Sequence, residues 1–206
     1  MPPSKIALIT CSARQARLNP FITTYIHDIL QQNLPSTSDI DITLSTIDLA
    51  NQNLPLYNEP AIPSHLPELN PTLHYTHEHT RAWSELIKKY DAFIFVTPQY
   101  NWSIPAVLKN ALDYLFYEWK GKTAGIVTYG GRGGGKAGEH LQGILRGLRM
   151  RPVSNMPGIV VSGDVLEGCL MEGKLSKEVL ERWREAGVEE QVWELFKKVV
   201  EGCRQR

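Results

Sequence analysis

Three short polar stretches hold the residues of this chain whose types and spacing could do chemistry. Residues 10–19 combine hydroxyls, two arginines and the start of a predicted helix, which suits a phosphate group. Residues 97–105 carry an aromatic and amide-bearing run between two prolines, which suits a rigid support for a flat polar ring. Residues 128–136 contain five glycines, so their backbone N–H groups can come very close to a ligand.

Each stretch also has a simpler interpretation. The first could be a polar loop capped by Asn19, the second a connector with Pro105 in the first turn of a helix, and the third a flexible linker. A flexible linker fits poorly between a buried strand and a helix. Cys11, in the first stretch, is either a reactive thiol near a helix terminus or a small packing residue. No Ser-His-Asp or Cys-His arrangement is legible from the spacing.

The elements around these stretches place them at one edge of a sheet. We predict strands at residues 5–10, 40–47, 92–96, 123–129 and 156–161, and helices at 19–32, 81–89, 106–116, 136–148 and 176–202, the last broken near Gly187. This alternation predicts a doubly wound parallel sheet with right-handed crossovers. All three stretches follow strands, and open α/β sheets bind ligands at the carboxyl ends of their strands.

The bulk composition is that of an ordinary globular protein. The 206 residues are 42% hydrophobic and 21% charged with zero formal net charge, which indicates neither nucleic acid nor an anionic membrane as a partner. We expect one domain over residues 1–206. The three cysteines lack paired spacing, and no apolar run approaches membrane-spanning length, so the expected location is the cytoplasm. Residues 54–80 form a long irregular stretch that suits a lid or a subunit contact.

Some motifs match their patterns without the expected context. Residues 130–136 have the spacing of a nucleoside-triphosphate loop, but Ala137 stands where a hydroxyl must hold magnesium. The glycines at 133, 135 and 138 match a dinucleotide fingerprint, but they follow a late strand without the required acidic partner. His74, His77 and His79 lie close together, yet their spacing fits no common zinc motif, so solvated histidines are favoured and no metal is expected.

Taken together, the three stretches resemble the NAD(P)H-dependent FMN reductase family of flavodoxin-like proteins, which includes quinone and azo-dye reductases. The resemblance covers about residues 5–165, with residues 174–202 as a further helical segment. It rests on Cys11, Ser12, Ala13, Arg14 and Arg17, then Thr97, Pro98, Gln99, Tyr100, Asn101, Pro105, Leu108, Lys109, Asn110 and Asp113, then Gly130, Gly131, Arg132, Gly133 and Gly134. Cys11 and Ala16 depart from the family, which usually has glycine there, so the phosphate loop is expected to be tighter or FMN affinity lower.

The resemblance implies a fold and a cofactor site. The fold is an α/β flavodoxin-like three-layer sandwich with a five-stranded parallel sheet in the order 2-1-3-4-5, the order known for flavodoxin. The implied FMN contacts are Ser12, Arg14, Arg17 and Asn19 for the phosphate, Pro98, Gln99, Tyr100, Asn101, Trp102 and Ser103 for the ring, and Gly130, Gly131, Arg132 and Gly133 on its other side. No protein nucleophile is required, because FMN itself reacts.

The resemblance also implies a reaction and partners. NADPH or NADH would reduce FMN at N5, and a quinone, a flavin or a similar small aromatic acceptor would then take the same stacking site, in a ping-pong mechanism. Arg132, or the helix N-terminus after Gly135, would stabilise negative charge near flavin N1. Members are usually homodimers or homotetramers. Two alternatives stay open: a one-electron flavodoxin carrier, which the neutral charge disfavours, and a flavin-binding regulatory module.

Overall fold

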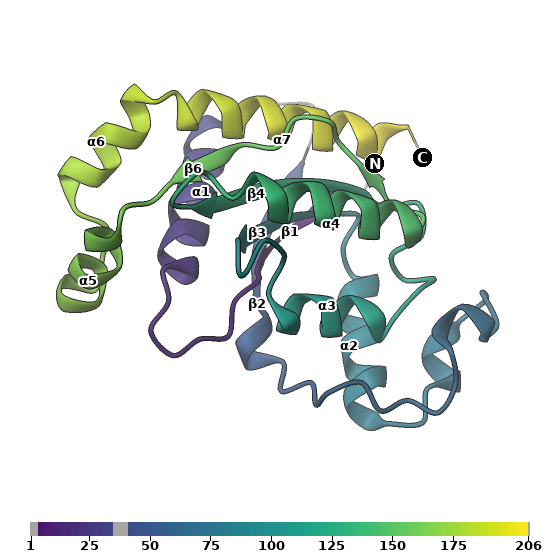
Figure 1. Ribbon diagram of the computed structural model, residues 1–206. Helices are drawn as coiled ribbons and strands as arrows, with labels where there is room; N and C mark the ends of the chain where they lie inside the picture. Colours follow the sequence, from purple (N-terminus) through teal and green to yellow (C-terminus); the bar gives the residue numbers. More distant parts are fainter. Residues whose placement is uncertain (1–3, 35–40, 206) are drawn as a thin grey trace.

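The computed structural model describes residues 4–34 and 41–205, and a parallel sheet forms its centre (Figure 1). Its long strands are β1 (Ser4–Thr10), β2 (Ile42–Asp48), β3 (Ala92–Pro98) and β4 (Thr123–Gly130). The strand order is β2-β1-β3-β4-β5, and each recorded pairing is parallel. The predicted order is therefore confirmed. Ile40, the predicted start of the second strand, lies outside the described residues.

The fifth position of the sheet is shared by two short strands. β5 (Arg151–Pro152) pairs with the start of β4, and β6 (Gly158–Val160) pairs with its end. The prediction of a strand at 156–161 found the second segment and missed the first. Proline has no N–H to donate to a sheet, and prolines stand at both sides of the gap, so the edge strand is interrupted there.

Helices cover both faces of the sheet and complete three layers. On one face, α2 (Glu78–Lys88), α3 (Ala106–Asp113) and α4 (Gly135–Gly147) pack with Phe93 and Phe95 in one buried cluster. On the other face, α1 (Asn19–Asn33) and α7 (Val188–Arg204) pack with Ile94 and Val96 in a second cluster. All seven residues of β3 are buried, because the strand is central and its alternate side chains enter opposite clusters.

The C-terminal region contains more helices than the sequence predicted. α5 (Gly163–Glu172) was not predicted, and the expected helix at 176–202 is divided into α6 (Lys177–Glu185) and α7. The division falls at the predicted place, because Gly187 adopts a left-handed conformation with φ of 71°. Figure 1 shows α5 and α6 at one side of the sheet and α7 lying across it.

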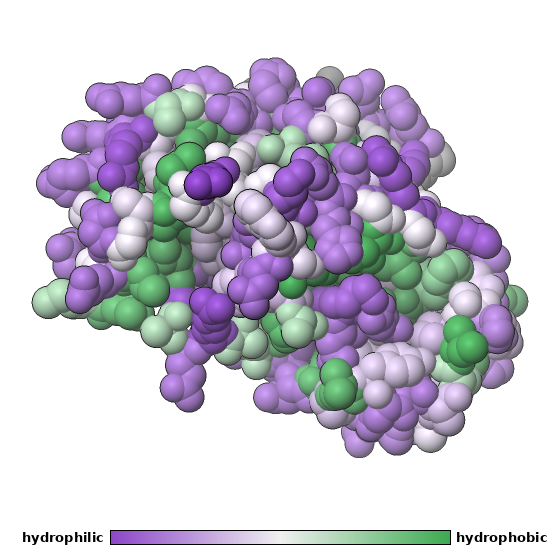
Figure 2. Space-filling model, viewed as in Figure 1, coloured by the Kyte–Doolittle hydropathy of each residue, from purple (hydrophilic) through white to green (hydrophobic). Residues whose placement is uncertain are grey.

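The segment between β2 and α2 is mostly irregular, with short 3₁₀ turns at Leu49–Asn51, Pro63–His65 and Pro71–His74. It is tied to α2 and to α3 and the turns after it. The side chain of Asn110 accepts from the N–H of Tyr57 (2.8 Å), and the buried carboxylate of Glu118 accepts from the hydroxyls of Tyr75 (3.1 Å) and Ser84 (2.5 Å). Figure 2 shows apolar side chains separated by polar ones over this part of the molecule. Its exposed apolar residues are Leu56, Ile62, Leu69 and Leu73.

Two features that would indicate other functions, a membrane-spanning helix and a metal site, are not found among the described residues. Within the described residues, no helix is both long and apolar enough to cross a membrane. The same residues contain no group of three or more His, Cys, Asp or Glu placed to hold a metal ion. The rings of His77 and His79 instead stack 5.1 Å apart, and both bond to Asn58.

Candidate functional site

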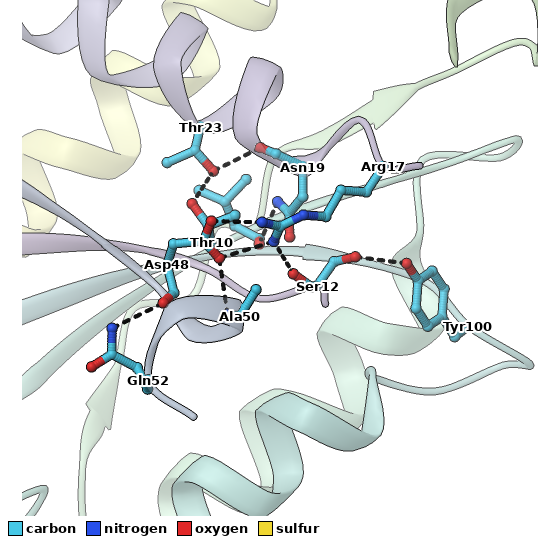
Figure 3. Close-up of polar contacts among 10 residues, drawn as sticks. Thr10, Ser12, Arg17, Asn19, Thr23, Asp48, Ala50, Gln52 and Tyr100 are labelled. Atoms are coloured by element: carbon cyan, nitrogen blue, oxygen red, sulfur yellow. Dashed lines mark hydrogen bonds and ion pairs between the residues drawn. The ribbon is translucent and has the colours of Figure 1, made fainter. Parts of the chain in front are cut away.

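The three polar stretches meet at the carboxyl edge of the sheet, where β1, β3 and β4 end side by side. The N–H of Cys11 donates to the carbonyl of Val96, and the N–H of Gln99 donates to the carbonyl of Tyr129. The hydroxyls of Ser12 and Tyr100 lie 2.8 Å apart in a hydrogen bond (Figure 3). Register alone brings these residues together, because parallel strands end at a common edge.

The neighbouring strand β2 adds an acid that the sequence did not single out. Thr10 and Asp48 are in register at the ends of β1 and β2. The carboxylate of Asp48 accepts two hydrogen bonds from Arg17, at 2.9 and 2.7 Å, and one from the N–H of Ala50 at 3.0 Å (Figure 3). Arg17 also donates to the carbonyl of Ser12. The hydrogen bond to Asp48 raises the pKa of the Arg17 guanidinium, so Arg17 is a fixed cation under the loop.

Asn19 has a structural position behind this loop. Its side chain has no exposed surface, and its Nδ2 donates to the carbonyl of Val96 at 2.9 Å, which ties the start of α1 to β3. The carbonyl of Asn19 also accepts from the hydroxyl of Thr23, which lies 3.0 Å from the hydroxyl of Thr10 (Figure 3). Asn19 is the first residue of α1, and the N-cap is Leu18, so the alternative interpretation, in which Asn19 caps the helix, is wrong.

The backbone at the start of α1 has the donors that an anion needs. Within residues 4–34 and 41–205, the N–H groups from Ala13 to Leu18 have no recorded acceptor. The first turn of α1 contains no acidic residue, and Leu18 supplies no side-chain cap. Free N–H groups, a helix N-terminus and the guanidinium groups of Arg14 and Arg17 are the donor set that a phosphate prefers. These residues therefore fit the phosphate end of FMN.

The second stretch forms a two-residue hairpin. Tyr100 and Ser103 exchange two backbone hydrogen bonds of 2.9 Å, and Asn101 and Trp102 between them have φ of 46° and 67°. Pro98 is the buried last residue of β3, so the hairpin rises directly from the sheet. The guanidinium of Arg14 lies 3.7 Å from the centre of the Tyr100 ring, which joins the first and second stretches a second time.

Helix α4 holds the hairpin from its other side. The Oε1 atom of Gln99 accepts from the N–H groups of Lys136 (3.0 Å) and Ala137 (3.4 Å), and Ser103 Oγ lies 2.6 Å from Nδ1 of His140. In this structure, Gln99 therefore partners the first N–H groups of α4. These two N–H groups are therefore occupied, and the expected use of that helix terminus for flavin charge stays a prediction. Arg132 has no ion pair among the described residues, so its charge is more available to a flavin than the N-terminus of α4 is.

The glycine stretch turns tightly between β4 and α4. Its turn is closed by a hydrogen bond from Gly133 N–H to the carbonyl of Gly130, at 3.0 Å. Gly134 has φ of 78°, and a Cβ there would lie 2.7 Å from the carbonyl oxygen of Tyr129, so glycine is required. A Cβ on Gly131 would meet no protein atom within 4 Å. The loop thus presents open backbone at Gly131, where a flat ligand can approach.

The site lacks an activated nucleophile among these residues. The thiol of Cys11 is completely buried, and burial raises its pKa well above the usual value, so the packing interpretation holds. Burial likewise raises the pKa of Tyr129. The hydroxyl of Ser12 faces Tyr100 instead of a general base. The arrangement can bind and orient a ligand, and a cofactor must supply the reactive atoms.

The comparisons with known proteins agree with this geometry. The sequence matches the family model of NADPH-dependent FMN reductases over residues 4–162. The chain belongs to the NADPH-dependent FMN reductase family. It is 34% identical to an NAD(P)H-dependent FMN reductase from Nectria sp over 206 residues, 98% of each chain. It is 38% identical to one from Saccharomyces cerevisiae over 154 residues, which cover 74% of this chain and 78% of the relative.

A solved structure supports the same fold for this family member. The flavoenzyme NAD(P)H:(acceptor) oxidoreductase from Paracoccus denitrificans superposes with a TM-score of 0.64 at 21% identity, covering 94% of this chain and 98% of the other. Family membership makes the protein an oxidoreductase that uses FMN with NAD(P)H. The one-electron carrier interpretation is therefore set aside.

The structure brings most of the predicted FMN contacts of this reductase to one edge. Those on the open side are Arg14, Gln99, Tyr100, Asn101, Trp102, Ser103, Gly130, Gly131 and Arg132. Ser12, Asn19, Pro98 and Gly133 are buried beneath them, and Arg17 is half-buried against Asp48. Each direct FMN contact stays a prediction. Sequence reasoning missed Asp48 and His140, and the signal for Asp48 was its place at the end of a predicted strand.

Proposed function

We propose that this protein passes reducing equivalents from NAD(P)H to a quinone or a similar small aromatic acceptor in a ping-pong reaction. Bound FMN would supply the hydride chemistry. The chain's own contribution is to bind the cofactor, to orient the reactants and to keep the site free of competing nucleophiles. A relative supports this acceptor class: the chain is 30% identical to a 2-hydroxy-1,4-benzoquinone reductase from Burkholderia sp over 167 residues, 78% of this chain and 79% of the relative.

The observation that carries the proposal is the fixed hairpin beside open glycine backbone. Tyr100 is held by Ser12 and Arg14, and Ser103 is held by His140, so the hairpin is a rigid support. Gly131 leaves free space next to it. A rigid support with one open side suits two flat substrates that bind in turn, which is the order that a ping-pong reaction needs.

Arg132 is the residue that we propose to stabilise negative charge on the reduced cofactor. It is exposed at the turn before α4 and has no ion pair among the described residues. We expect Arg132→Ala to slow reduction by NADPH by about tenfold at full FMN occupancy. Arg146→Ala, in the last turn of the same helix, is the matched control and should leave the rate unchanged. Stopped-flow loss of flavin absorbance measures both, and an unchanged rate in Arg132→Ala contradicts this role.

We further propose that the working form is a homodimer or homotetramer in a reducing compartment such as the cytoplasm. The exposed leucines at 56, 69 and 73 are a candidate contact surface for another copy. None of the three cysteines forms a disulfide with another described residue, which is consistent with a reducing environment. Sedimentation of the purified protein tests the assembly, and a monomer at micromolar concentration would contradict it.

A further inference from the structure

The tip of the hairpin combines a disfavoured backbone with an exposed indole. Asn101 and Trp102 are the two central residues of the turn, and both have positive φ. Asparagine tolerates this left-handed conformation, but the second position of such a turn usually holds glycine. Here it holds Trp102, whose φ is 67° and whose surface is 66% exposed. The turn therefore holds a bulky side chain in a backbone conformation that favours glycine.

The contacts of the hairpin stems hold the turn in this conformation. Tyr100 is fixed by the hydroxyl of Ser12 and by Arg14 over its ring. Ser103 is fixed by the two backbone bonds to Tyr100 and by His140, 2.6 Å away. A disfavoured backbone persists where its surroundings over-determine it, and such positions cluster at functional sites.

The exposure of Trp102 also contrasts with the other tryptophans of the chain. Trp83, Trp119 and Trp183 are at most 2% exposed, and Trp193 is half-buried against Phe196. The indole of Trp102 is thus available at the rim of a site that is built for flat rings. A tryptophan face stabilises a planar aromatic partner through offset stacking, in addition to the apolar area that it covers.

We propose that Trp102 is a specificity-determining residue that stacks on the aromatic acceptor, and that the left-handed turn is retained because it aims the indole at that ring. The inference rests on the proposed function and assigns its acceptor a protein contact besides the cofactor. An acceptor with an extended planar ring gains from this contact, and a small non-aromatic acceptor does not.

Equilibrium binding to the oxidised, FMN-loaded protein tests the proposal without turnover. The probe is 1,4-naphthoquinone, followed by the change in flavin absorbance and by quenching of tryptophan fluorescence in the absence of NAD(P)H. We expect the Kd to rise about 3- to 10-fold in both Trp102→Ala and Trp102→Gly, and to change less than about twofold in Trp102→Phe, which keeps a stacking ring.

The same variants report on the backbone. Trp102→Gly should melt about 2–4 °C above Trp102→Ala, because glycine adopts the left-handed conformation without a Cβ clash. Arg149→Gly is the matched control, since Arg149 has φ of 60° at the C-terminal end of α4, beyond the last helical residue. It should raise the melting temperature by a similar amount and leave the Kd for the quinone unchanged.

The outcomes separate this proposal from the function on which it rests. The stacking role is wrong if NADPH bleaches the flavin of the wild-type protein and the Ala and Gly variants bind the quinone as tightly as the wild type does. Dissociation of the assembly in both variants with an unchanged Kd also overturns it, because Trp102 would then be an interface residue. A wild-type protein that NADPH does not bleach contradicts the proposed function instead.

Discussion

The ion pair between Arg17 and Asp48 gives a prediction whose size can be worked out from the structure. The two side chains are 15% and 23% exposed and share two charge-assisted hydrogen bonds. Fully exposed pairs contribute about 0–1 kcal/mol, and hydrogen bonds to charged groups about 1.5–3 kcal/mol. For this half-buried pair we expect Asp48→Asn to lower the free energy of unfolding by about 1–2 kcal/mol. The asparagine Oδ1 can still accept from Ala50.

Thermal unfolding with and without FMN measures this change. In a chain of this length the loss corresponds to about 2–8 °C in the melting temperature of the FMN-free protein. Saturating FMN should then raise the melting temperature of Asp48→Asn by more than it raises that of the wild type. The reason is that the substitution removes a negative charge beside the phosphate loop and frees the Arg17 guanidinium for the phosphate.

A matched control and two contrary results make the test decisive. Asp113→Asn breaks an exposed pair with Lys109 on α3 and should change stability by less than about 0.5 kcal/mol. An unchanged melting temperature in Asp48→Asn would refute the stabilising role of the pair. A variant that unfolds earlier but loses the response to FMN would refute the idea that Asp48 competes with the phosphate for Arg17.

Two further predictions concern the glycine loop and an acid far from it. Gly131→Ala should leave stability nearly unchanged but weaken FMN binding several-fold, as measured by flavin fluorescence, because its Cβ meets open space that the cofactor needs. Gly143→Ala, on the exposed side of α4, should stabilise by about 1 kcal/mol without changing FMN affinity. Burial opposes ionisation of Glu59, but the N–H groups of Thr76 and His77 donate to its carboxylate, and its pKa is lowered overall. Its contribution is therefore present above its unfolded pKa of about 4.5 and lost as the pH falls through the lower folded value. Glu59→Gln should melt earlier than the wild type at pH 7, and a difference that persists unchanged at pH 3 would contradict this reasoning.

The sequence predicted the sheet because its central strands are unambiguous. The run at 92–96 is apolar without interruption, which indicates burial on both faces, and the structure buries all of β3. The three loops were predicted for the same reason, since each directly follows such a strand. The edge strand was harder, because β5 has two residues and β6 has three, too few for a periodic pattern.

Contacts across the sheet could not be predicted from local pattern. The pairing of Arg17 with Asp48 depends on the register of β1 against β2, which fixes Thr10 opposite Asp48. The bond between Ser103 and His140 depends on where α4 packs beside the hairpin. Helix α5 was missed because its glycines at 163 and 168 lower the helical signal. Each of these features is set by tertiary packing, which overrides local propensity.

The burial of Cys11 has a consequence for the quinone acceptor that we propose. Quinones are electrophiles, and a thiolate beside their binding site would add to the ring and inactivate the enzyme. Cys11 lies at the end of β1, next to the loop that reaches Tyr100, yet its sulfur is fully covered and its raised pKa keeps it protonated at neutral pH. A quinone bound as proposed would therefore meet no reactive thiol at Cys11, although the family usually has glycine at this position.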